Sequence, residues 1–264
     1  MSLQRECFRM DIDWAKASRR LQEDVRLRGD AVAVRFLESA SELSSFPGRS
    51  MRDTAICQMI LRARFDGADG VLASSPSTMR CVWGAAALGL IDTPPRLSRG
   101  QLYLGFVQDL EAGERMHARM GMMGDRGKRY GAVEVAPLAH CRGDPDVVVI
   151  YGTPGQMLRL ITGLHFEEGG AVCSPVTGQA SVCASISRAH DTGEPSLDIP
   201  CIGDRLYGLV GDDEMVMVLP ADRMPGLMRG LEGSKPMAPY PFRPFTRWSP
   251  IFPPAMLPTK EELE

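Results

Sequence analysis

The sequence has few lysines, no block of like charges and no long apolar run, and the last two absences exclude certain classes of protein. Its 264 residues include four lysines against 26 arginines, and the net charge is −3. No block of like charges is present, so the composition favours neither a nucleic-acid binder nor a protein of anionic membrane surfaces. The longest apolar stretch, Cys81 to Ile91, is far shorter than the roughly 20 residues that a membrane-spanning helix needs. We therefore expect no nucleic-acid partner and no membrane partner.

The N-terminus and the cysteines indicate the compartment. Arg5, Glu6, Arg9 and Asp11 interrupt the first residues, which therefore lack the apolar core of a signal peptide. Seven irregularly spaced cysteines, an odd number, do not resemble a secreted disulfide framework. We expect a cytoplasmic protein with reduced thiols. No CxxC pair occurs, which excludes a zinc knuckle or a ferredoxin-type run built from local spacing.

Strand-like and helix-like segments alternate along the chain. Apolar runs typical of strands are separated by segments with helical spacing, such as 52–65 and 80–91. This order predicts an α/β fold, in which helices flank a layered mixed sheet that is largely parallel. The expected strands are 31–37, 70–75 and 132–138.

The clearest supersecondary signal is the segment "PDVVVIYGTPGQMLRLITGL", residues 145–164. Its apolar β-formers lead into Thr153 as a helix N-cap and Pro154 at the first helical position, which predicts a strand–turn–helix unit. The segment 212–231 repeats the plan at a shift of 67 residues. Duplication of one unit and chance similarity between two units both account for the repeat.

The last thirty residues differ from the rest. Residues 235–258 hold eight prolines, with Tyr240, Phe242, Phe245, Trp248 and Phe252 between them. Such a segment is neither a helix nor a central strand, and it is too apolar for a solvated tail. We expect one α/β domain over residues 1–234 and an extended arm over 235–264, which either wraps its own body or embraces a second subunit. A homo-oligomer held by this arm is the expected assembly.

Several segments in order resemble one family. They are "VAVRFL" (32–37), "CVWGAAALGL" (81–90), "APL" (136–138), "PDVVVIYGTPGQMLRLI" (145–161) and "IPCIGDR" followed by "DDEM" (199–215). Together they resemble the domain of unknown function 169 family over about residues 30–232. The resemblance implies cytosolic proteins that are frequent in archaea and anaerobic bacteria, and it supplies no catalytic residues.

Four cysteines, Cys57, Cys81, Cys183 and Cys201, lie in or beside these segments. Thiolates from distant segments can hold an iron–sulfur cluster or zinc if the fold brings them together. The alternative is that they are buried as small apolar side chains. The first hypothesis is therefore a protein that binds a metal or cofactor through these four residues.

Cys201 has a second interpretation as a nucleophile. Arg205 is close enough in sequence to favour a thiolate, and Asp204 stands between them, so these three residues form a candidate catalytic set. The alternative is that Asp204 and Arg205 only close a turn. This second hypothesis is an enzyme that acts on a small anionic molecule.

The turn at 151–156 offers a place for such an anion. Backbone N–H groups at a helix N-terminus suit an anion, and Thr153 and Gln156 would be the polar contacts. Arg126, in the basic glycine-rich loop 121–131, could close over it. An ordinary strand–helix connection and a solvated loop are the alternatives.

A third hypothesis is a non-catalytic oligomeric protein of assembly or regulation.

Overall fold

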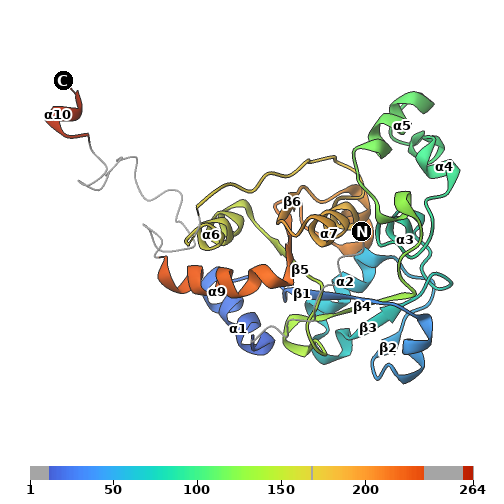
Figure 1. Cartoon of the computed structure of the whole chain (residues 1–264), viewed down its shortest axis with the longest axis horizontal. Coiled ribbons are helices and arrows are strands. Elements are labelled where there is room, and N and C mark those ends of the chain that lie inside the picture. Colours follow the sequence, from blue (N-terminus) through green and yellow to red (C-terminus); the bar gives the residue numbers. More distant parts are fainter. Residues whose placement is uncertain (1–11, 168, 235–257, 264) are drawn as a thin grey trace.

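The structure is a computed structural model that describes residues 12–167, 169–234 and 258–263. Within these ranges a seven-stranded sheet lies between two layers of helices (Figure 1). The strands are β1 (Val32–Leu37), β2 (Arg49–Ser50), β3 (Leu72–Ser74), β4 (Ala132–Pro137), β5 (Val147–Gly152), β6 (Ser196–Asp198) and β7 (Met215–Pro220). The helices are α1 (Trp14–Val25), α2 (Ile56–Phe65), α3 (Val82–Ala87), α4 (Pro95–Ser98), α5 (Leu110–Ala118), α6 (Pro154–Leu164), α7 (Ser181–Thr192), α8 (Ile202–Gly208), α9 (Met224–Gly233) and α10 (Lys260–Leu263).

The sheet is mixed, as the sequence predicts, but the expectation of a largely parallel sheet is wrong. The strand order is β2-β3-β4-β1-β5-β7-β6. Only β2 and β3 pair in parallel, and every other neighbouring pair is antiparallel. The α/β class with flanking helices is confirmed.

The error has a physical reason. Continuous apolar strands are typical of parallel sheets because helices cover both faces of such sheets. Here helices cover both faces of an antiparallel sheet, so the strands are just as apolar. The chain also changes face between β5 and β7: α6 packs on one side and α7 on the other, so neither helix returns to a neighbouring parallel strand.

Alternate residues of each central strand enter the two separate cores. On β1, Val32, Val34 and Phe36 pack with α2, α3 and α7, whereas Ala33 packs with α1, α6 and α9. On β5, Tyr151 points to the side of α2 and α7. Figure 1 shows α1, α6 and α9 gathered on one side of the molecule, with α4 and α5 at the far end. The predicted cysteine segments belong to the layer of α2, α3, α7 and α8.

The strand–turn–helix unit at 145–164 is confirmed. Thr153 caps α6 and accepts a hydrogen bond from the backbone N–H of Gln156, and Pro154 is the first helical residue. The repeated segment forms β7 and α9, and β7 is the antiparallel neighbour of β5. Helices α6 and α9 touch where Gly163 of one meets Gly230 of the other, because neither residue has a side chain to hold the backbones apart.

Replacement of Gly230 by alanine is expected to destabilise the protein by at least about 2 kcal/mol, because overpacking a close backbone contact forces a shift of the helix. A Cβ at this position would overlap the carbonyl oxygen of Gly163. Gly226→Ala on the same helix is the control. Its added Cβ would meet nothing nearer than 3.9 Å, and it should leave stability unchanged or raise it by up to about 1 kcal/mol through helix propensity. Urea unfolding of both variants makes the comparison, and equal stability would contradict the close contact.

The expected C-terminal arm lies almost wholly outside the described residues, so its role stays a prediction. The division into a domain over 1–234 and an arm also stays a prediction. None of the described helices is long and apolar enough to cross a membrane.

Candidate functional site

The four cysteines of the family-like segments meet at one cavity. Cys57, Cys81, Cys183 and Cys201 all line a space of about 120 Å³. The four positions are spread over the chain between residues 57 and 201, and the other residues that line the cavity are mainly apolar. The other lining residues are Ile56, Trp83, Phe106, Gln179, Ala180, Ile202, Gly203 and Asp204.

Each of these cysteines stands at the N-terminal end of a helix. Cys57 is the second residue of α2 and Cys183 is the third of α7, while Cys81 and Cys201 directly precede α3 and α8. The backbone N–H of Gly84 donates to the Cys81 sulfur at 3.5 Å. Backbone N–H groups and positive helix ends favour negative charge, so this arrangement suits sulfur atoms that become thiolates.

Burial keeps the four thiols mainly protonated at neutral pH. Burial raises the pKa of Cys57 to about 12 and raises the pKa of Cys183 well above its ordinary value. Burial also raises the pKa values of Cys81 and Cys201, although backbone N–H groups of Asp204, Ser181 and Gly203 partly oppose this for Cys201. Neutral thiols are weak nucleophiles and must lose protons before they bind a metal.

Asp204 is the carboxylate of this cavity. Its side chain is 1% exposed and accepts hydrogen bonds from the Cys201 backbone N–H at 3.1 Å and from the Tyr151 hydroxyl at 3.3 Å. Burial raises the pKa of Asp204 to about 6. At neutral pH the group is therefore mainly charged, and this negative charge further raises the thiol pKa values of Cys57, Cys81 and Cys201.

Arg205 does not join the cavity. Its guanidinium donates to the Gly211 carbonyl at 3.0 Å and to Asp212 at 2.7 Å, beyond the end of α8. The segment around it is the first turn of a helix, not the tight turn suggested by the Gly-Asp-Arg sequence. The described residues that line the cavity include no Lys, Arg or His. Arg205 thus lies where it does not promote a Cys201 thiolate.

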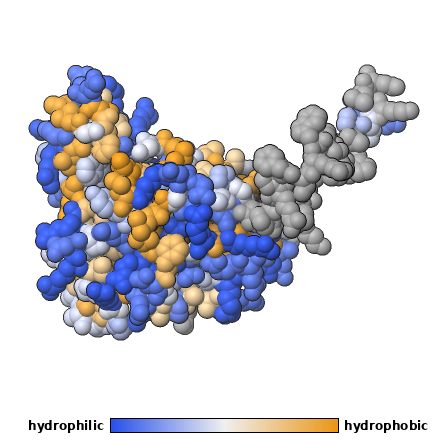
Figure 2. All heavy atoms as spheres, turned by 180° about the vertical axis from the view of Figure 1, so that it is seen from behind, coloured by the Kyte–Doolittle hydropathy of each residue, from blue (hydrophilic) through white to orange (hydrophobic). Residues whose placement is uncertain are grey.

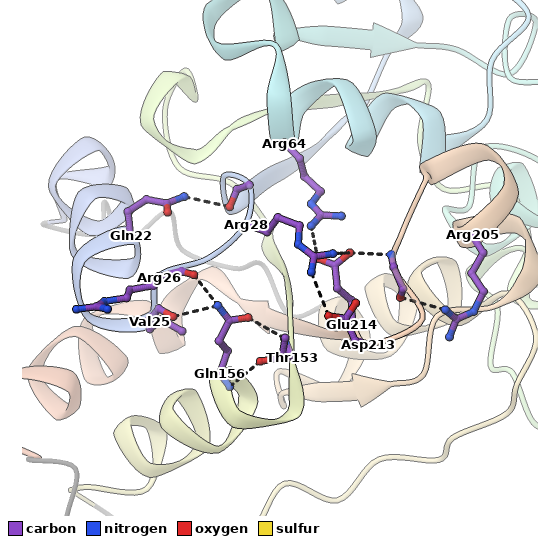
Figure 3. Close-up of polar contacts among 12 residues, drawn as sticks. Gln22, Val25, Arg26, Arg28, Arg64, Thr153, Gln156, Arg205, Asp213 and Glu214 are labelled. Carbon is purple, nitrogen blue, oxygen red and sulfur yellow. Dashed lines mark hydrogen bonds and ion pairs between the residues drawn. The ribbon is translucent and has the colours of Figure 1, made fainter. Parts of the chain in front are cut away.

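Behind the cavity lies a buried ion pair. Arg64 donates to Glu214 at 2.5 Å, and both side chains are 2% exposed (Figure 3). The guanidinium of Arg64 also lies 4.6 Å from the centre of the Tyr151 ring. Because the Tyr151 hydroxyl donates to Asp204, the ion pair is connected through Tyr151 to the carboxylate that lines the cavity.

The residues predicted to bind an anion lie elsewhere. The Gln156 amide donates to the carbonyls of Val25 and Arg26 at 3.1 and 2.6 Å, and its oxygen accepts from the Thr153 N–H (Figure 3). Arg126 is paired with Asp191. These groups hold α1, α6 and α7 in place, and none lines the cysteine cavity. An anion site at Thr153, Gln156 and Arg126 stays a prediction that these contacts do not favour.

The structure brings the thiols to one cavity without forming a finished metal site. Among residues 12–167, 169–234 and 258–263, no three His, Cys, Asp or Glu side chains are arranged so that they could hold one metal ion. The cavity is larger than the ~30 Å³ that a water molecule occupies in the liquid. It is smaller than the roughly 300 Å³ at which pockets for drug-sized ligands begin. Its size therefore suits a compact occupant.

Reasoning from the sequence identified the four cysteines and Asp204 but missed the other lining residues, among them Trp83 and Phe106, and the supporting Tyr151. Trp83 was detectable, because it follows Cys81 by two positions within "CVWG". Tyr151 ends the apolar run of β5, where a hydroxyl among apolar residues is a signal for a buried hydrogen bond. Phe106 has no such signal, since only the folded chain brings it to the cavity.

Fold and cavity define an α/β protein with a pocket of four cysteines, and comparison with known proteins gives its family. The profile of the domain of unknown function 169 family, described as "Uncharacterised ArCR", matches residues 20–230. The chain belongs to this family, which confirms the resemblance found in the sequence. Uncharacterised protein MJ0308 of Methanocaldococcus jannaschii is 26% identical over 228 residues, covering 84% of this chain and 96% of the relative. No solved structure matches the chain.

Proposed function

We propose that this protein binds a compact thiolate-ligated metal centre, an iron–sulfur cluster, through Cys57, Cys81, Cys183 and Cys201. The observation that carries the proposal is that cysteines from four distant segments line one small cavity. Two other described cysteines, Cys141 and Cys173, are absent from that lining. Burial as ordinary apolar side chains does not require four thiols to share one space.

The cavity wall supports the same interpretation. Soft thiolates select metals such as iron in clusters, zinc or copper(I). Trp83, Phe106 and Ile202 supply apolar walls, and burial of this kind tunes the potential of a cluster and shields it from water. The volume of about 120 Å³ is too small to enclose a whole nucleotide or flavin, and it exceeds the space that a single ion needs.

Loading requires two local changes. The thiols must lose their protons, so loading is expected to strengthen as pH rises. The sulfurs must also turn toward a common point, which cysteine can do because it has one side-chain torsion. The resulting anionic centre would be stabilised by the N-terminal ends of α2 and α7.

Thiol footprinting tests the proposal. The chain is loaded anaerobically with ferric iron, sulfide and dithiothreitol, which supplies the electrons for any ferrous iron in the cluster. It is then desalted and alkylated, and each cysteine peptide is quantified by mass spectrometry. We expect loading to protect Cys57, Cys81, Cys183 and Cys201 and to leave the exposed Cys173 reactive. Loading with zinc alone is the comparison, and equal protection by zinc would favour a single ion over a cluster. Unchanged alkylation under both conditions would overturn the proposal.

A nucleophilic Cys201 is the competing proposal, and one contact favours it. Asp204 lies against Cys201 and, with a pKa of about 6, is charged at neutral pH and able to accept a proton. Against it stands the raised pKa of the Cys201 thiol, caused first by burial and then by the Asp204 charge. Arg205 is engaged with Asp212 and does not offset that charge.

The alkylation rate of Cys201 separates the two proposals. Because the pKa of Cys201 is raised, its thiolate is scarce at pH 7 and alkylation should be slower than that of a free cysteine in solution. The rate should increase above pH 9, which is the ordinary pKa of the thiol. Peptide mapping of wild type and Cys201→Ser across this pH range gives the measurement. A rate at pH 7 above that of the free amino acid would support the nucleophile instead.

A further inference from the structure

Helix α8 exposes an apolar face beside the mouth of the cavity. Ile202 and Leu206 are four residues apart and therefore lie on one side of the helix, and Leu209 directly follows its last residue. They are 51%, 62% and 69% exposed, although all three are large and apolar. The opposite side of α8 packs on α2. One side of α8 is therefore buried, and its other side is apolar but exposed to solvent.

The open face continues across the cavity mouth. Ile202 and Phe106 both line the cysteine cavity, and both are about half exposed. Tyr207 and Ile199 are also at least half exposed and adjoin or belong to α8 in sequence. We name these residues together the α8 face: Phe106, Ile199, Ile202, Leu206, Tyr207 and Leu209. Seen from behind, the half of the molecule that carries α4 and α5 shows several patches of apolar surface (Figure 2).

The area of the α8 face approaches that of a protein interface. At about 200 Å² for each large side chain, six half-exposed residues present roughly 600 Å² of mainly apolar surface. The largest apolar patch of a typical monomer is about 300–600 Å². A stable interface takes about 800 Å² from each partner. The α8 face is thus at the upper limit for a monomer and supplies most of one side of a dimer interface.

The charges of α8 fit a second copy of the same chain. Asp204 is buried, and Arg205 is paired with Asp212, so the helix itself presents no unpaired charge outward. Two identical neutral faces meet across a two-fold axis without like-charge repulsion. We propose that two copies of this chain associate through the α8 face and close each other's cysteine cavity at its mouth. This proposal concerns the cover of the cavity and does not depend on what the cavity binds.

Analytical ultracentrifugation of the full-length chain tests this interface. Wild type is expected to sediment as a dimer at about 10 μM, as an interface of this size allows. Leu206→Glu, which places a buried charge at the interface twice per dimer, should weaken association at least ~100-fold. Leu158→Glu is the matched control, because Leu158 is 56% exposed on α6 and lies outside the α8 face. It should remain a dimer.

Two further readouts distinguish loss of the interface from loss of the fold. Both leucine variants should keep the circular dichroism spectrum of wild type and unfold cooperatively, since each side chain is more than half exposed. Cys201 should be alkylated faster in Leu206→Glu than in wild type, because its cavity has lost its cover. Removal of residues 235–264 should leave the dimer intact. A monomeric wild type at ~100 μM, well above the affinity expected for a standard interface, would overturn the proposal. A dimer that survives Leu206→Glu but is lost with residues 235–264 would also overturn it.

Discussion

Replacement of Cys183 by serine is expected to abolish loading of the metal centre. Cys183 is 7% exposed and lies at the third position of α7, where no neighbouring side chain takes over the role of its sulfur. Loss of residues that merely support a metal ligand costs about 10–100-fold in affinity, and loss of a ligand itself should cost at least as much. Iron content per chain after anaerobic loading gives the measurement.

The same chain supplies matched controls for this prediction. Cys141→Ser and Cys173→Ser remove thiols that do not line the cavity and should load as wild type does. Serine is close to cysteine in size, so the Cys183 variant should still unfold cooperatively. Equal loading of all three variants would show that the cavity thiols are not ligands.

Replacement of Arg64 by methionine is expected to destabilise the protein by about 3–5 kcal/mol, the cost of leaving one partner of a buried ion pair uncompensated. Glu214 would keep its hydrogen bond from the Gly211 N–H at 2.9 Å and the half-exposed Arg28 at 3.9 Å, but it would lose its one buried cation among the described residues. Urea unfolding monitored by circular dichroism gives the free energy of unfolding.

The control lies two residues away on the same helix. Arg62 pairs with Asp66 at 2.6 Å, but both side chains are about one-third exposed. Arg62→Met should therefore change stability by at most about 0.5 kcal/mol. The double variant Arg64→Met with Glu214→Leu should regain much of the loss, because apolar residues often replace a buried pair without cost. Equal effects of Arg62→Met and Arg64→Met would contradict the buried pair.

The parts of the fold that depend on local chemistry were predictable. Thr153 and Pro154 mark the start of α6 in any context, because an N-cap and a proline act on their own turn. Strand direction was not predictable, because burial on both faces gives the same apolar pattern to parallel and antiparallel strands. The path of the chain between β5 and β7 decides the direction, and no local pattern encodes it.

The candidate site divides in the same way. The sequence identified Cys57, Cys81, Cys183 and Cys201 as a set, but only the packing of α2, α3, α7 and α8 brings them to one cavity. Proximity in sequence was misleading for Arg205, because the first turn of α8 directs Asp204 inward and Arg205 outward. Neighbours along the chain are neighbours in a site only when the local conformation allows it.

Anaerobic purification followed by iron and acid-labile sulfide analysis tests the proposed metal centre most directly. We predict a coloured protein with iron and sulfide in equal amounts, and a colourless Cys183→Ser variant prepared in parallel. A colourless wild-type protein that binds neither iron nor zinc, with all four cavity thiols open to alkylation, would contradict it.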